Sequence, residues 1–227
     1  FSSAPFGFFQ EFQVKTGGYS VEFGRSTGGV INAVTRSGSN EFEGGAEVTF
    51  EPNAWRSAAR DHFHRDGSPH SYASTDATSF TKTNVWGSGA LVKDKLFLFA
   101  MYEKRDTDGN NTSSDGRTWF DNTGDDDFWG AKLDWNITDN HTLELLAFSD
   151  ETETTQASSG YNWDTQTLGQ WGGDTLTDGG GKNWSATYTG RFGESFTAKA
   201  MVGQNNQRAF SNSTLDLYCD AVFTDAT

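Results

Sequence analysis

From residue 43 onward, apolar and polar side chains alternate with a period of two in about seven segments of the chain. Four of these segments are regular. Their apolar faces consist of Gly44, Ala46, Val48 and Phe50; Trp129, Ala131, Leu133, Trp135 and Ile137; Trp184, Ala186, Tyr188 and Phe192; and Phe196, Ala198, Ala200 and Val202. Phe128 and Met201 are exceptions, because they fall on the polar side. The more mixed segments 84–92, 96–105 and 142–150 are also expected to be strands, so the pattern predicts an all-β chain.

The connections between these segments are alternately short and long. Short turns are expected at 93–95, 138–141 and 193–195, whereas long polar connections are expected near 53–82, 107–126 and 152–181. Outer-membrane barrels have this layout, with short periplasmic turns and long extracellular loops. Structureless loops longer than about 15 residues are uncommon in a compact soluble domain. The pattern therefore favours part of a transmembrane, antiparallel, up-and-down β-barrel.

Composition narrows the alternatives. Aromatic residues make up 15% of the 227 residues, and 26 glycines accompany only 3 prolines, a balance that favours strands and turns. No apolar run approaches the roughly 18 residues of a membrane-spanning helix. The mean hydropathy of −0.66 does not exclude spanning strands, because such strands present only one face to lipid. A soluble β-rich hydrolase or sugar-binding domain remains an alternative, although no catalytic constellation stands out.

Charge argues against one class of partner. The formal net charge is −14, whereas nucleic-acid binding depends on Lys and Arg contacts to phosphate, so no nucleic-acid partner is expected. The acidic residues crowd the expected long connections, where solvated loops are the simplest interpretation. Cys219 has no second cysteine within the chain to pair with.

The first 42 residues follow a different pattern. Short strands are expected over 8–14 and 30–35, separated by the glycine pairs at 17–18 and 28–29. The run EFQVKTGGYSVEFGRSTGGVINAVTRSG, residues 11–38, closely resembles the end of the plug domain of TonB-dependent outer-membrane receptors, in particular the Oar-like branch. The runs GSGALVKDKLFLF at 87–99 and LDWNITDNH at 133–141 resemble that branch's barrel hairpins.

This resemblance implies a plug domain ending at residue 42 and the N-terminal portion of a barrel over 43–227, in a family whose barrels have about 22 strands. It implies transport of a large solute, such as a peptide, glycan or metal chelate, across the bacterial outer membrane. The implied partners are the TonB complex, through a TonB box upstream, membrane lipid, and possible surface lipoproteins or other outer-membrane proteins. No cofactor and no enzymatic activity are implied. Protein secretion or surface-complex anchoring without uptake remains the alternative.

Two groups of residues are candidates for function within this reading. Charged residues that could join plug and barrel are Glu22, Arg25, Arg36, Glu43, Glu47 and Glu51; the alternative is that they are hydrated charges of the barrel lumen. Aromatic residues that could face a ligand in the connection 152–181 are Tyr161, Trp163 and Trp171; the alternative is that these rings pack on the connection itself or on its neighbours. His62, His64 and His70 lie close together in sequence, but they lack a recognisable metal-ligand spacing, so no metal site is expected.

Overall fold

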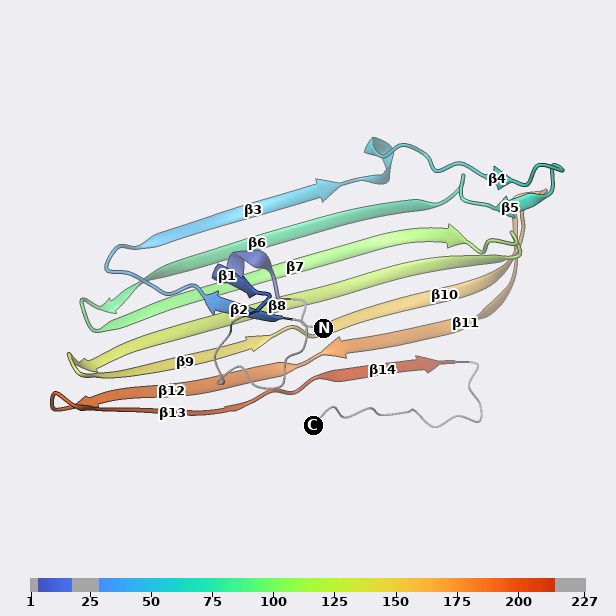
Figure 1. Ribbon diagram of the computed structural model, residues 1–227. Helices are drawn as coiled ribbons and strands as arrows, with labels where there is room; N and C mark the ends of the chain where they lie inside the picture. The colour runs from blue at the N-terminus through green and yellow to red at the C-terminus, as the bar shows by residue number, and fades with distance from the viewer. Residues whose placement is uncertain (1–3, 18–28, 215–227) are drawn as a thin grey trace.

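The computed structural model describes residues 4–17 and 29–214, almost entirely as β-strands (Figure 1). These residues contain the short 3₁₀ turns η1 and η3 and no helix long and apolar enough to cross a membrane. The elements are η1 (Phe6–Phe8), β1 (Phe9–Lys15), β2 (Val30–Thr35), β3 (Glu43–Glu51), η3 (Asn53–Trp55), β4 (His62–Phe63), β5 (Pro69–Ser71), β6 (Ala77–Val92), β7 (Leu96–Thr112), β8 (Thr118–Thr138), β9 (His141–Ser149), β10 (Thr152–Asn162), β11 (Thr167–Gly180), β12 (Lys182–Phe192), β13 (Phe196–Gln204) and β14 (Arg208–Ser213).

The main sheet is an antiparallel meander in which each strand pairs with the next, as the expected up-and-down fold requires. Three of its long strands are interrupted without any change of register. Trp129 pairs with Ser149 and Asp126 with Thr152, so β9 and β10 are two parts of one strand opposite β8. In the same way β11 continues into β12, and β13 into β14. Over the described residues β3 and β13 are paired along one edge only, so this sheet is open.

The interruptions lie side by side across the sheet. Asp150 is fully buried between β9 and β10, and its carboxylate accepts the backbone N–H of Gly181 at 3.0 Å. The Asp150 N–H donates to the Gly181 carbonyl at 3.1 Å. Gly180 has a positive φ of 74°, and a Cβ there would lie 2.0 Å from the Asp150 carbonyl oxygen. A side-chain hydrogen bond and a glycine thus replace regular pairing at this point.

Two of the three segments that were expected to be long connections between strands consist mostly of strands, so the prediction is wrong for them. Most of 107–126 belongs to β7 and β8, which are joined by a turn at residues 113–117, and 152–181 forms the hairpin of β10 and β11. Polar side chains on both faces hid these strands, because period-two apolar alternation is produced only where one face is apolar. Only 53–76 is mostly irregular, with β4 and β5 as a small hairpin. The short turns expected at 93–95, 138–141 and 193–195 are confirmed.

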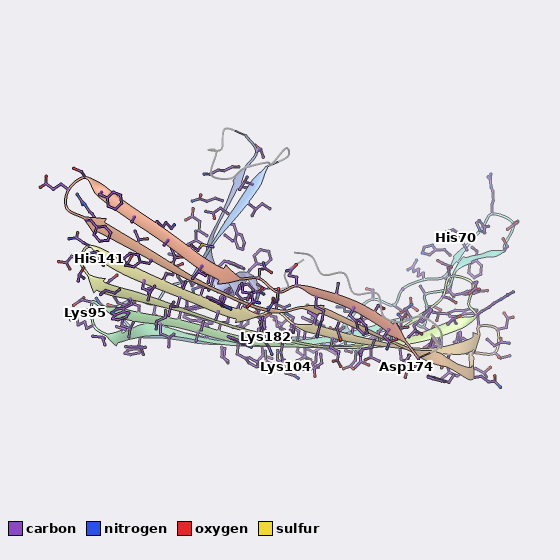
Figure 2. All side chains as sticks on the ribbon, turned by 90° about the horizontal axis from the view of Figure 1, so that it is seen from below. His70, Lys95, Lys104, His141, Asp174 and Lys182 are labelled. Atoms are coloured by element: carbon purple, nitrogen blue, oxygen red, sulfur yellow. The ribbon has the colours of Figure 1, made fainter. Side chains whose placement is uncertain are left out.

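The two faces of the main sheet differ in chemistry. We call the face against which residues 4–9 pack the inner face, and the opposite one the outer face (Figure 2). The four regular apolar sets expected from the sequence all fall on the outer face, where large side chains such as Trp135 remain 43% exposed. Exposed apolar area of this extent marks a surface that meets another apolar phase.

The apolar band on the outer face crosses the strands obliquely. Following the strand pairs from Glu47, at the middle of the apolar run on β3, leads to Phe128 on β8. Following them from Lys199, at the middle of the run on β13, leads to Asn136 on β8. Phe128 and Asn136 lie eight residues apart on β8, and six strand-to-strand steps separate β3 from β13. The band therefore shifts by about 27 Å along the strand direction while it crosses about 29 Å of sheet, so it is inclined by about 43° to the perpendicular of the strands. Barrel strands tilt by roughly 35–45° from the barrel axis, so the band is level in such a barrel.

The buried apolar core is small and lies on the inner face. Among the described residues it comprises Phe8, Phe99, Met101 and Phe128. Phe8 belongs to the N-terminal segment, and the other three belong to β7 and β8. Gly130 on β8 leaves the space that the Phe8 ring fills, because a Cβ there would lie 2.3 Å from Phe8 Cε2.

Replacing Gly130 with Val should therefore displace Phe8 and release the N-terminal segment from the sheet, at a cost of about 1–3 kcal/mol typical of overpacked cores. Limited proteolysis of the full-length protein should show faster cleavage within residues 4–40. Ala131→Val is the matched control, since the adjacent residue lies on the outer face. Equal protease resistance of Gly130→Val and the parent protein would contradict this packing.

Candidate functional site

The N-terminal segment is held on the inner face by one aromatic side chain. Pro5 is extended, and the following turn is closed by a hydrogen bond from the Phe8 N–H to the Pro5 carbonyl at 3.0 Å. This turn directs Phe8 into the sheet, where it is 1% exposed. Its ring centroid lies 5.1 Å from that of Phe128 and 6.0 Å from those of Phe99 and Phe148. Edge-to-face and tilted pairs at these separations are favourable beyond the area that they bury.

Arg36 fixes the other end of the same segment. β1 and β2 form an antiparallel hairpin, and directly after it the Arg36 N–H donates to the Phe8 carbonyl at 3.0 Å. The Arg36 guanidinium lies over the Trp86 ring at 4.0 Å and 5.2 Å from the centre of the Phe99 ring. A partly desolvated cation over an aromatic face is stabilising. The hairpin is therefore anchored at both of its ends.

Polar contacts continue this attachment toward the turn between β6 and β7. Lys132 Nζ donates to the Ser37 hydroxyl at 3.0 Å and lies 3.0 Å from the Glu144 carboxylate. Its side chain is only 6% exposed, so the carboxylate offsets the cost of burying the ammonium. Asn40 donates to the Asp94 carboxylate at 2.6 Å and accepts the Asp94 N–H at 2.8 Å.

Two of the glutamates expected to join plug and barrel, Glu47 and Glu51, pair with cations of the barrel segment instead. Glu47 pairs with Lys82 at 3.2 Å and Glu51 pairs with Arg56 at 2.9 Å. Glu43 lies on the same inner face of β3, opposite Ser88 on β6. Arg36 meets aromatic rings instead of these carboxylates. Glu22 and Arg25 lie outside the described residues, as does Cys219.

Sequence reasoning missed the residues that make most of this junction, namely Phe8, Trp86 and Lys132. A signal was available in Phe128, which breaks the polar pattern of its face. An apolar residue on an otherwise polar strand face marks a place where something packs. The partner that packs there comes from about 120 residues earlier in the chain.

A second charged group is buried on the inner face beside the junction. Glu103 is 2% exposed and accepts hydrogen bonds from Asn84 at 2.8 Å and from Arg105 at 2.6 Å. Arg105 lies opposite Asp126 on β8, and the Asp126 carboxylate accepts a hydrogen bond from the Glu153 N–H at 3.2 Å. The inner face thus compensates its buried charges within the sheet.

The aromatic residues expected to face a ligand lie at the end of the sheet away from the short turns. Tyr161 and Trp163 pack within a group of rings, with Trp163 4.4 Å from Tyr72 and Tyr161 5.2 Å from Trp119. These contacts tie the hairpin of β10 and β11 to the segment 53–76 and to β8. Trp171 is 59% exposed and donates to Asp174 at 3.0 Å.

The segment 53–76 is also attached to the end of β7. The Asp76 carboxylate accepts the Thr112 N–H at 2.9 Å, and Asn110 donates to the Thr75 carbonyl at 2.9 Å. Burial raises the pKa of Asp76, against the effect of the Thr112 hydrogen bond. Of the three nearby histidines, His64 and His70 are in ring contact at 4.8 Å. Among the residues that the structure places, no three His, Cys, Asp or Glu side chains are arranged to hold a metal ion.

Comparison with known proteins identifies a relative of part of this chain. A stretch of 98 residues is 41% identical to the TonB-dependent transporter Oar of Myxococcus xanthus. The match covers 42% of this chain and 9% of that transporter, so the chain spans a small part of the relative's length. No family model matches the chain, and no solved structure matches it. The match supports a relationship to TonB-dependent receptors.

Replacement of Arg36 tests its role in the junction. Arg36→Ala should loosen residues 30–40, because the cation–aromatic contact, worth about 2 kcal/mol when desolvated, is lost. Arg36→Lys should have a smaller effect, since an ammonium keeps the charge but not the planar stacking. Hydrogen exchange of residues 30–40 in the full-length protein is the measurement. The control is Arg191→Ala, which removes an arginine from the inner face of β12. Equal hydrogen exchange in the two Ala variants would refute the role of Arg36 in the junction.

Proposed function

We propose that this chain is part of an energy-dependent transporter of the bacterial outer membrane, with the end of a plug domain in residues 1–42 and the first strands of its barrel in 43–227. The transporter imports a large solute. The observation that carries the proposal is the inclined apolar band on an open, antiparallel meander, together with the identity to a TonB-dependent transporter.

The dimensions of the band agree with a lipid-facing surface. On β8 its apolar positions run from Trp129 to Ile137, about 27 Å along the strand. Across a band inclined by about 43° this is about 20 Å, close to the roughly 25 Å apolar band of outer-membrane barrels. The short turns lie at one border of the band, and β7, β8, β10 and β11 extend well beyond the other border. We assign the short turns to the periplasm and the long extensions to the cell exterior.

The junction on the inner face supplies the plug-to-barrel attachment that a gated barrel needs. Residues 4–9 and 30–40 are fixed to β6, β7 and β8 by Phe8, Arg36 and the Lys132–Ser37 hydrogen bond. The chain performs no covalent chemistry in this proposal. Energy coupling would come from the TonB complex, which binds a TonB box upstream of these residues.

Adjacent substitutions on β12 test the lipid-facing assignment. Ala186 lies in the middle of the apolar band and Thr187 beside it on the inner face. Ala186→Arg should impair assembly, because Arg at the bilayer midplane of a barrel costs roughly 2–4 kcal/mol. Thr187→Arg should be nearly neutral. The amount of heat-modifiable full-length protein in the outer-membrane fraction is the measurement, and equal yields of the two variants would reject a lipid-facing band.

Energy coupling is tested separately. Full-length protein should co-purify with the periplasmic domain of TonB from the same organism, and deletion of the upstream box should abolish this without lowering the outer-membrane yield. A correctly assembled protein that shows no box-dependent association would reject TonB-driven uptake and favour anchoring or secretion.

A further inference from the structure

Beyond the apolar band, the acidic residues are segregated to the outer face of the sheet. On β7 and β8 this outward set includes Asp106, Asp108, Asp121 and Asp125. On β10 and β11 it continues with Glu153, Asp174 and Asp178. Figure 2 shows Lys104 and Asp174 on the side of the sheet opposite the β1–β2 hairpin. Beyond the row of Arg105 and Asp126, these acidic side chains therefore all lie on one side of the sheet.

Beyond the row of Arg105 and Asp126, the inner face of β6, β7, β8, β10 and β11 carries no charged side chain. Three cross-strand rows pass through Phe120, Asn122 and Gly124 on β8 and reach β11 through β10. Every position of these rows on β6, β7, β8, β10 and β11 is Thr, Ser, Asn, Gln, Gly or Phe. We call this surface the distal wall. It begins directly after the row of Arg105 and Asp126. At its β3 edge Glu51, which pairs with Arg56 at 2.9 Å, lies opposite Phe80 on the inner face.

Hydrogen bonds fix the amide side chains of the distal wall. Gln156 donates to the Asn122 carbonyl oxygen at 2.8 Å, and Asn122 donates to the Asn111 carbonyl oxygen at 2.8 Å. Gln156 and Asn122 each donate one of their two side-chain N–H groups in these hydrogen bonds, and Asn111 accepts through its side-chain oxygen. The three amides are therefore oriented in advance, with polar atoms left for a ligand. Phe80 and Phe120 place aromatic rings on the same face, two strands apart.

We infer that the distal wall binds an uncharged, hydroxyl-rich solute, namely a neutral oligosaccharide, on its way to the gate. This inference rests on the proposed function and specifies the solute class. Oriented amides and hydroxyls complement sugar hydroxyls in both donor and acceptor roles, and aromatic rings complement the apolar faces of pyranoses. Glycines between these side chains leave room for a bulky ring.

The wall suits other solute classes less well. An extended peptide gains affinity by pairing with a free strand edge, whereas β7, β8 and β10 are hydrogen-bonded on both sides here. A cationic solute or metal chelate would be drawn to carboxylates, but these rows carry none on β6, β7, β8, β10 and β11, and the Glu51 carboxylate at their β3 edge is paired with Arg56. An anionic solute would require Lys or Arg, which these rows lack.

The test uses the full-length protein in detergent and isothermal titration with defined probes. The neutral probes are maltohexaose, cellohexaose and mannohexaose, and the comparison probes are an oligogalacturonate and an acidic, a basic and a neutral peptide. We expect a neutral hexaose to bind most tightly. The double variant Asn122→Ala/Gln156→Ala should weaken this binding about tenfold or more, which corresponds to about 1.4 kcal/mol. The matched double variant Asp121→Asn/Thr123→Ala, on the outer face of β8, should leave it unchanged.

Two results would overturn the inference: tighter binding of any peptide or of the oligogalacturonate than of all three neutral sugars, or equal effects of the two double variants. Absence of binding by every neutral sugar would overturn it as well. Each of these three binding results can be obtained with protein that assembles in the outer membrane and associates with TonB. Failure of the solute assignment is therefore distinguishable from failure of the transporter proposal.

Discussion

Backbone pairing along the meander keeps the same register past the point where three long strands are interrupted, and the separation of the two faces depends on this. Because side chains alternate between faces, a shift of one residue would exchange the faces. At the interruption, Asp150 and Gly181 bond to each other through a side chain and backbone groups, so the strands resume in step. On the interrupted strands, the apolar band and the distal wall lie on opposite sides of the row of interruptions, and they lie on opposite faces of the sheet.

The outer face and the inner face have different energetic requirements. Leu145 faces outward and remains 38% exposed, and in the proposed barrel lipid would remove this apolar area from water without burying a polar group. The inner face buries polar groups such as Glu103 and Lys132, which are satisfied by hydrogen bonds and ion pairs within the sheet or to residues 37–40. In the proposed barrel one sheet would meet both lipid and water, and the N-terminal segment attaches on the polar face.

The attachment itself is mostly apolar and aromatic. Phe8 contributes the buried ring, and Arg36 adds a cation on Trp86 instead of an ion pair with a glutamate. An ion pair at this place would have carried a desolvation cost that the aromatic contact reduces, because guanidinium is weakly hydrated and stacks on rings. Shape, through the space at Gly130, then fixes where the segment sits.

The sequence by itself determined the strand class, the short turns and the apolar faces, because period-two alternation and turn residues are local properties. It could not determine that 107–126 and 152–181 are strands, since polar side chains on both faces remove the alternation there. It also could not pair Phe8 with Phe128 or Arg36 with Trp86, because contacts between residues far apart in the chain depend on how the strands pair in the sheet and where the N-terminal segment packs on it. The direction in which Asp121 and Asn122 point was likewise decided by register, which only the assembled sheet defines.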